Sequence, residues 1–158
     1  MRNFSDLKLR HFGRPVPTAC SQPDIDRFEA RYDVRLPRAY AQLLLYSNGG
    51  YPAANVFPLP PGSEDSEFAI NDFYYLLPDV RTDPQGGSGS NLWFRMEVAA
   101  GHLPPKSVPI AADAFGNEVF LDVSEDPAPV FVRLHDPDEG SRVADSFEAF
   151  LDLLRPES

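Results

Sequence analysis

Residues 36–50, LPRAYAQLLLYSNGG, constrain the fold of this chain more than any other stretch. Pro37 stands where a helix would begin, and the first helical position loses nothing when the N–H group is missing. A face of residues at helical spacing follows, and then an Asn-Gly-Gly sequence that can supply the left-handed residue ending a helix. These residues are Tyr40, Leu43, Leu44 and Ser47, followed by Asn48, Gly49 and Gly50. The stretch predicts a short, buried helix over 37–47.

Three further helices are indicated by capping residues placed before apolar faces. Ser21 is an N-cap for a helix over roughly 22–32, and either Ser90 or Asn91 can cap another that ends near residue 100. Ser146 precedes a final helix with apolar residues at positions i, i+3, i+4 and i+7. That last face consists of Phe147, Phe150, Leu151 and Leu154.

Alternating apolar residues predict several strands, of which the last three are joined by short turns into an antiparallel meander. The predicted strands are 55–59, 68–73, 108–112, 118–123 and 130–135. Residues 74–77 fit either a strand or a single helical turn. Helices packed around one antiparallel sheet define an α+β domain. We expect an N-terminal arm over residues 1–20 and a single domain over 21–155.

Charge is distributed unevenly along the 158 residues, whose net charge is −10. Residues 1–60 carry eight Lys or Arg against five Asp or Glu, whereas 61–158 carry six against nineteen. A nucleic-acid-binding protein normally has the opposite sign. An acidic surface favours basic protein partners and speeds their association. Solubility alone is the alternative explanation.

The cellular location is predicted from what the sequence lacks. Cys20 is the only cysteine, which excludes an internal disulfide and suits a reducing compartment. The first residues contain no long apolar run, and no stretch approaches the roughly 20 apolar residues that a membrane helix needs. We therefore expect a cytoplasmic protein without a membrane segment.

Recognisable catalytic, cofactor and metal motifs are missing from the sequence. There is no G-x-S-x-G motif around a serine, and Gly86, Gly87 and Gly89 are not spaced as a phosphate-binding loop. The sequence His135-Asp136-x-Asp138 has no second His or Cys nearby to complete a metal site. We predict no catalytic residue, no cofactor and no metal.

The ordered caps, turns and core positions resemble the SUKH superfamily, which includes yeast cell-wall-synthesis regulators and many bacterial immunity proteins. The matching residues are Ile25, Phe28, Glu29, Tyr32, Leu36, Pro37, Tyr40, Leu43, Leu44, Asn48, Gly49, Gly50, Val108, Pro109, Ile110, Ala111, Asp113, Gly116, Asn117, Leu121, Asp122, Val130, His135, Asp136, Ser146, Phe147, Phe150 and Leu151. The resemblance implies an α+β fold with helices around a twisted antiparallel sheet. It carries over no active site, because these residues specify the fold.

Two functions are implied by the resemblance. The first is a non-catalytic bacterial immunity protein that binds and neutralises a cognate toxin domain, with a basic nuclease as the expected class. The second is an intracellular regulatory module of the cell-wall-regulator type. Candidate partner-binding residues are the acidic Glu64, Asp65, Glu67, Asp72, Asp79 and Asp83 and the aromatic Tyr51, Tyr74, Tyr75 and Trp93. For the aromatic residues, core packing is the alternative.

Overall fold

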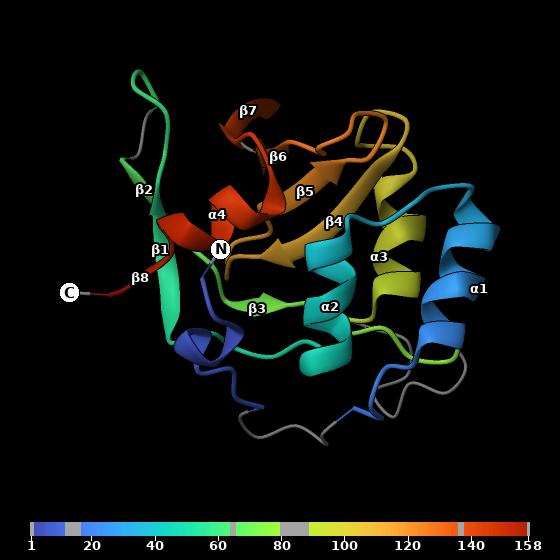
Figure 1. Ribbon diagram of the computed structural model, residues 1–158. Coiled ribbons are helices and arrows are strands. Elements are labelled where there is room, and N and C mark those ends of the chain that lie inside the picture. Colours follow the sequence, from blue (N-terminus) through green and yellow to red (C-terminus); the bar gives the residue numbers. More distant parts are fainter. Residues whose placement is uncertain (1, 12–16, 64–65, 80–88, 136–137, 158) are drawn as a thin grey trace.

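Two antiparallel sheets and four α-helices form the described part of the chain. The computed structural model describes residues 2–11, 17–63, 66–79, 89–135 and 138–157. Figure 1 shows the helices grouped around the larger sheet, with the smaller sheet at one end of the molecule. The predicted α+β class is confirmed, although two sheets replace the single one expected.

The first two helices follow their local sequence signals closely. Helix α1 spans Gln22–Tyr32, as predicted, and the Asp24 carboxylate accepts a hydrogen bond from the Ser21 N–H at 3.0 Å. Helix α2 spans Arg38–Tyr46, so Pro37 is the N-cap and not the first helical residue. Pro37 still takes part in the first turn of the helix, because its carbonyl accepts a hydrogen bond from the Ala41 N–H.

Asn48 does more than end a helix, because its side chain ties three segments together. Its Nδ2 donates to the carbonyls of Thr18 and Leu76 at 2.8 and 2.7 Å, and its Oδ1 accepts from the Leu76 N–H at 2.7 Å. Gly49 and Gly50 follow with positive φ angles of 80° and 121°. Gly50 exchanges backbone hydrogen bonds with Phe73. The turn after α2 therefore holds the N-terminal segment and the start of the larger sheet in register.

The larger sheet contains the predicted meander. Among the described residues, its strand order is β3-β4-β5-β6-β7, with all pairs antiparallel. Its strands are β3 (Asp72–Phe73), β4 (Ser107–Ala112), β5 (Glu118–Asp122), β6 (Val130–His135) and β7 (Asp138–Ala144). Strand β7 was not predicted, because a charged edge strand containing a glycine lacks apolar alternation.

The smaller sheet has the order β2-β1-β8 in the described chain. Its strands are β1 (Ala54–Pro58), β2 (Glu67–Ala69) and β8 (Arg155–Pro156). The single strand predicted over 68–73 is one extended segment that pairs first with β1 and then with β4. The segment after β3 forms no helical turn, and Tyr75 makes one parallel bridge with Asn91.

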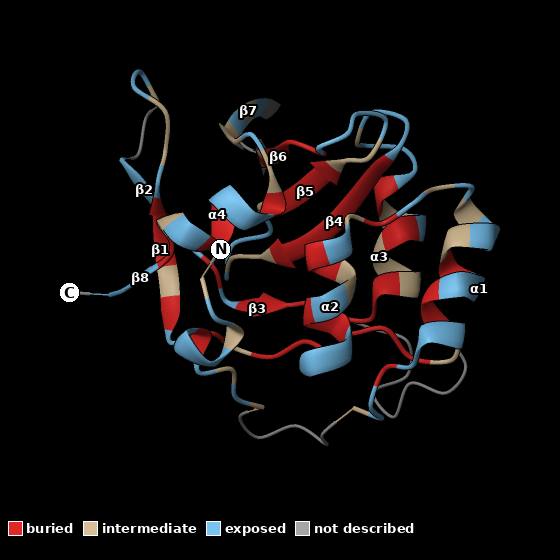
Figure 2. Cartoon of the chain, in the orientation of Figure 1, coloured by how far each residue is buried: buried red, intermediate tan, exposed pale blue. Residues whose placement is uncertain are grey.

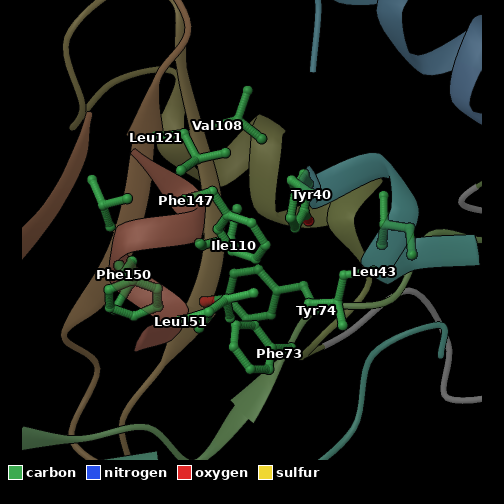
Figure 3. Packing of buried hydrophobic residues seen from close by; sticks show 14 of the residues in the cluster. Tyr40, Leu43, Phe73, Tyr74, Val108, Ile110, Leu121, Phe147, Phe150 and Leu151 are labelled. Carbon is green, nitrogen blue, oxygen red and sulfur yellow. The ribbon is translucent and has the colours of Figure 1, made fainter. Parts of the chain in front are cut away.

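The remaining two helices pack against the larger sheet, α3 (Leu92–Ala99) against β4 and α4 (Phe147–Leu153) against β7. Helix α3 is capped by the Asn91 side chain, and α4 by Ser146, whose Oγ accepts from the Ala149 N–H at 3.1 Å. The main core lies between α2, α4 and one face of β4 and β5, as Figures 2 and 3 show. There the rings of Tyr40 and Phe147 meet edge to face with centroids 5.3 Å apart.

The N-terminal segment packs onto the domain. A 3₁₀ helix over Phe4–Leu7 places the Leu7 side chain in the core with no exposed surface, and the Leu7 carbonyl accepts a bond from the Ala53 N–H. Arg10 then forms an isolated antiparallel β-bridge with Tyr51. No helix among the described residues has both the length and the apolar character needed to span a membrane.

Candidate interaction site

The turn between β4 and β5 is held by one carboxylate. Asp113 Oδ1 accepts bonds from the N–H groups of Phe115 and Asn117 at 2.8 and 2.9 Å, and Oδ2 accepts from the Asn117 Nδ2 at 2.7 Å. Gly116 takes a φ of 90° between them, a conformation that glycine adopts without strain. This network leaves Phe115 at the tip, with 78% of its surface exposed. A large aromatic side chain on a pre-organised turn is a strong candidate for a partner anchor.

A groove of about 930 Å³ runs between this turn and the smaller sheet. One wall is the segment of residues 67–71, and the other includes Asp113 and Phe115. Tyr51 and Leu134 add further aromatic and apolar surface. The described lining residues include three acids, Glu67, Asp113 and Glu157, and no Lys or Arg. The groove therefore combines apolar surface with negative charge.

Two of the predicted partner-binding residues, Tyr51 and Glu67, lie together in this groove. Tyr51 is half-buried, and Glu67 is exposed and forms an ion pair with Arg155 of β8. Glu157 Oε1 accepts a bond from Asn55 Nδ2 at 2.7 Å. The role of Tyr51 and Glu67 in binding a partner stays a prediction, but the fold does bring these two residues to one surface.

Asp72 and Tyr74 lie in the interior and do not reach this surface. Asp72 is 4% exposed and accepts a bond from the Ser90 hydroxyl. Tyr74 is 2% exposed, and its hydroxyl donates to Glu118 Oε2 at 2.8 Å. Burial, reinforced by the nearby Glu118 charge, raises the pKa of Tyr74 far above its usual value. For Tyr74, as for the buried Tyr75, the structure matches the core-packing alternative.

Trp93 is half-buried in an aromatic cluster with Phe28 and Tyr32. Its indole Nε1 donates to the Leu77 carbonyl at 2.7 Å, which fixes the ring against the chain that precedes α3. Asp79 is partly exposed and lies away from the groove lining. The other acidic candidates, Glu64, Asp65 and Asp83, lie outside the described residues.

Phe115 is the main site residue that the sequence did not single out. The sequence places Asp113, Gly116 and Asn117 at a turn but gives no role to the side chain at its tip. The local sequence does contain a signal for it: an aromatic residue inside a tight polar turn has no apolar neighbours to pack against and is therefore exposed. Leu134 and Glu157 had no local signal, since only the tertiary fold brings them to the groove.

The described residues offer little for covalent or metal chemistry. No group of three or more His, Cys, Asp or Glu side chains within them could hold a metal ion. The sequence 135–138 lies partly outside the described residues. Burial, with the Asp24 charge nearby, raises the pKa of Cys20 to about 12. The thiol is therefore protonated near neutral pH and is a poor nucleophile in the folded chain.

The two sheets, the helices around them and the order of the caps and turns define an α+β domain of the SUKH type. The chain belongs to the SMI1 / KNR4 family (SUKH-1), whose model matches residues 19–153. The match runs from α1 to the end of α4 and confirms the predicted superfamily. No match was found among curated proteins or among solved structures. Membership of this family supports a role in protein–protein interaction.

Proposed function

We propose that the protein is a bacterial, cytoplasmic immunity protein that binds a cognate toxin domain and neutralises it without catalysis. The observation that carries this proposal is the acidic groove beside the exposed ring of Phe115. The groove lies next to a rigid turn, in a chain that belongs to the SMI1 / KNR4 family. Toxins that act on nucleic acid need a basic substrate surface. An acidic groove with an aromatic residue at its rim suits such a surface, and a basic nuclease domain is the class of toxin we favour.

The proposal is tested by co-expression with the C-terminal domain encoded by the adjacent upstream gene. We expect a stoichiometric complex and rescue of cells that express this domain. Because the groove is acidic, raising salt is expected to slow association, as measured by stopped-flow mixing. With both proteins shown to be folded, the absence of complex and of rescue would contradict the proposal. It would favour a regulatory module of the cell-wall-regulator type instead.

The exposed ring of Phe115 gives a direct mutational prediction. Phe115→Ala is expected to weaken binding of the toxin domain about 30-fold, because an aromatic anchor at an interface contributes about 2 kcal/mol. The free energy of unfolding should stay unchanged, since the turn is held by Asp113 and not by the ring. Isothermal titration calorimetry and urea denaturation measure the two quantities.

Leu45 provides the matched control, because it is also an exposed apolar residue, with 41% of its surface accessible, but lies on α2 and outside the groove. Leu45→Ala is expected to leave the affinity unchanged. Equal losses in both variants would argue against the groove as the binding surface.

A further inference from the structure

The outer edge of β2 carries backbone groups that β1 does not use. Leu59 N–H donates to the Ser66 carbonyl at 2.9 Å, and Ile70 N–H donates to the Asn55 carbonyl at 2.8 Å. Successive residues of a strand direct their N–H and C=O groups to opposite sides. Glu67 and Ala69 therefore direct these groups away from β1. Strand β2 ends the smaller sheet, so no described strand lies beside this edge.

Residues 67–73 form one extended segment, and its outward side, which has no described strand beside it along β2, pairs with β4 from Asn71 onward. Asn71 N–H donates to the Ala112 carbonyl at 2.8 Å, and Asp72 pairs with Ala112. If β4 continued straight, its next residues would pair with Ala69 and Glu67. Instead, the Asp113 network turns the chain into β5. The place beside the β2 edge is left to the groove, which is lined by residues 67–71 on one side and by the turn on the other.

The chemistry of the groove defines what can occupy this place. The described lining residues carry three carboxylates and no Lys or Arg, although Glu67 is paired with Arg155 of β8 and Asp113 holds the turn. The remaining negative charge favours positively charged side chains. Leu59, Leu134 and Phe115 offer apolar surface. An extended strand presents alternate side chains to opposite faces, so it can carry basic and apolar residues in alternation.

We propose that the outer edge of β2 binds an extended, basic segment of the protein partner as an additional antiparallel strand, in the position that a longer β4 would take. The backbone groups of Glu67 and Ala69 pair with this segment, and the groove receives its side chains. That the natural partner is a toxin domain rests on the proposed function; the mode of binding does not.

The variant Ala69→Pro removes an outward N–H group without touching the hydrogen bonds to β1. Proline is tolerated on an edge strand when its missing N–H faces away from the ladder. Ala69→Val is the matched control, because it enlarges the side chain and keeps the N–H group. Both variants are expected to remain folded, with cooperative thermal unfolding followed by circular dichroism.

A partner-independent probe is a displayed library of random dodecapeptides panned against the full chain. We expect enriched peptides in which basic and apolar residues alternate. Ala69→Pro should weaken their binding at least about tenfold, the effect of losing one backbone hydrogen bond or more, and Ala69→Val less than about threefold. Enrichment of no peptide, or equal binding to both variants, would overturn the proposal.

Hydrogen exchange on the wild-type chain keeps the proposal testable if Ala69→Pro does not fold. The Glu67 and Ala69 amides should exchange rapidly in the free protein and become protected when an enriched peptide binds. Unchanged exchange at both amides would count against strand addition. These peptide experiments use no toxin, so their failure is distinguishable from a failure of the co-expression test.

Discussion

Glu118→Leu is expected to destabilise the protein by about 3–5 kcal/mol, the cost of leaving a buried charge without its partner. Glu118 accepts a bond from the Tyr74 hydroxyl and forms a 3.0 Å ion pair with Arg95. The two charged side chains are only 11% and 20% exposed. The Arg95 guanidinium also lies 5.3 Å from the centroid of the Tyr74 ring. Removal of the carboxylate leaves a cation and a hydroxyl buried together. Urea denaturation measures the change in the free energy of unfolding.

The double variant Arg95→Met/Glu118→Leu separates the ion pair from simple packing. Replacing a buried ion pair by apolar residues of similar volume is often nearly neutral, so the double variant should recover more than half of the loss.

The variant Arg142→Met is the control for an exposed ion pair. It removes the pair with Asp145 and is expected to cost less than about 1 kcal/mol. A loss below about 1 kcal/mol for Glu118→Leu would show that the pair does not stabilise the fold.

Gly49→Ala is expected to cost about 3 kcal/mol of unfolding free energy for two separate reasons. The φ of Gly49 is 80°, a region that residues with a Cβ atom occupy only at a cost of about 1–2 kcal/mol. A Cβ atom there would also lie 3.0 Å from both the Phe73 carbonyl oxygen and the Tyr75 Cβ. Backbone of the larger sheet would have to shift, which adds a further overpacking cost of about 1–3 kcal/mol.

Gly62→Ala is the matched control for Gly49→Ala. Gly62 has a φ of 93°, but nothing lies within 4 Å of the position its Cβ would take. It should therefore show only the backbone cost, about 1–2 kcal/mol. The difference between the two variants in thermal or urea unfolding reports the close approach between the α2 turn and β3. Equal losses would show that this approach is not tight.

The parts of the fold that depend on local chemistry were predictable from the sequence. Ser21, Asn91 and Ser146 mark helix starts because a cap acts within a few residues of itself. The β4–β5–β6 meander was predictable because apolar alternation and short turns are also local. Strand β8 was not, since it pairs Pro156 with Ala54, about two thirds of the chain earlier in the sequence, and carries no apolar pattern of its own.

The candidate site was less predictable, because periodicity shows which residues share a face but not which face meets solvent. Asp72 and Tyr74 belong to an extended segment whose charged and aromatic residues suggested a surface, yet both point into the interior. Glu67, a few residues earlier, lies at the surface because the side chains of β2 alternate between two faces, and Glu67 is on the face opposite the buried Phe68. The groove itself depends on the distance between two sheets, which no local pattern encodes.

The way Asp113 closes the β4–β5 turn has a consequence for how such a protein can change its partner. The carboxylate, Gly116 and the Asn117 amide define the backbone, and the ring of Phe115 takes no part in any of these bonds. Substitutions at position 115 can therefore alter the proposed binding surface while the folding of the domain stays intact. Partner specificity and fold stability therefore depend on different residues of this turn. Related proteins could differ at position 115 and still keep the fold.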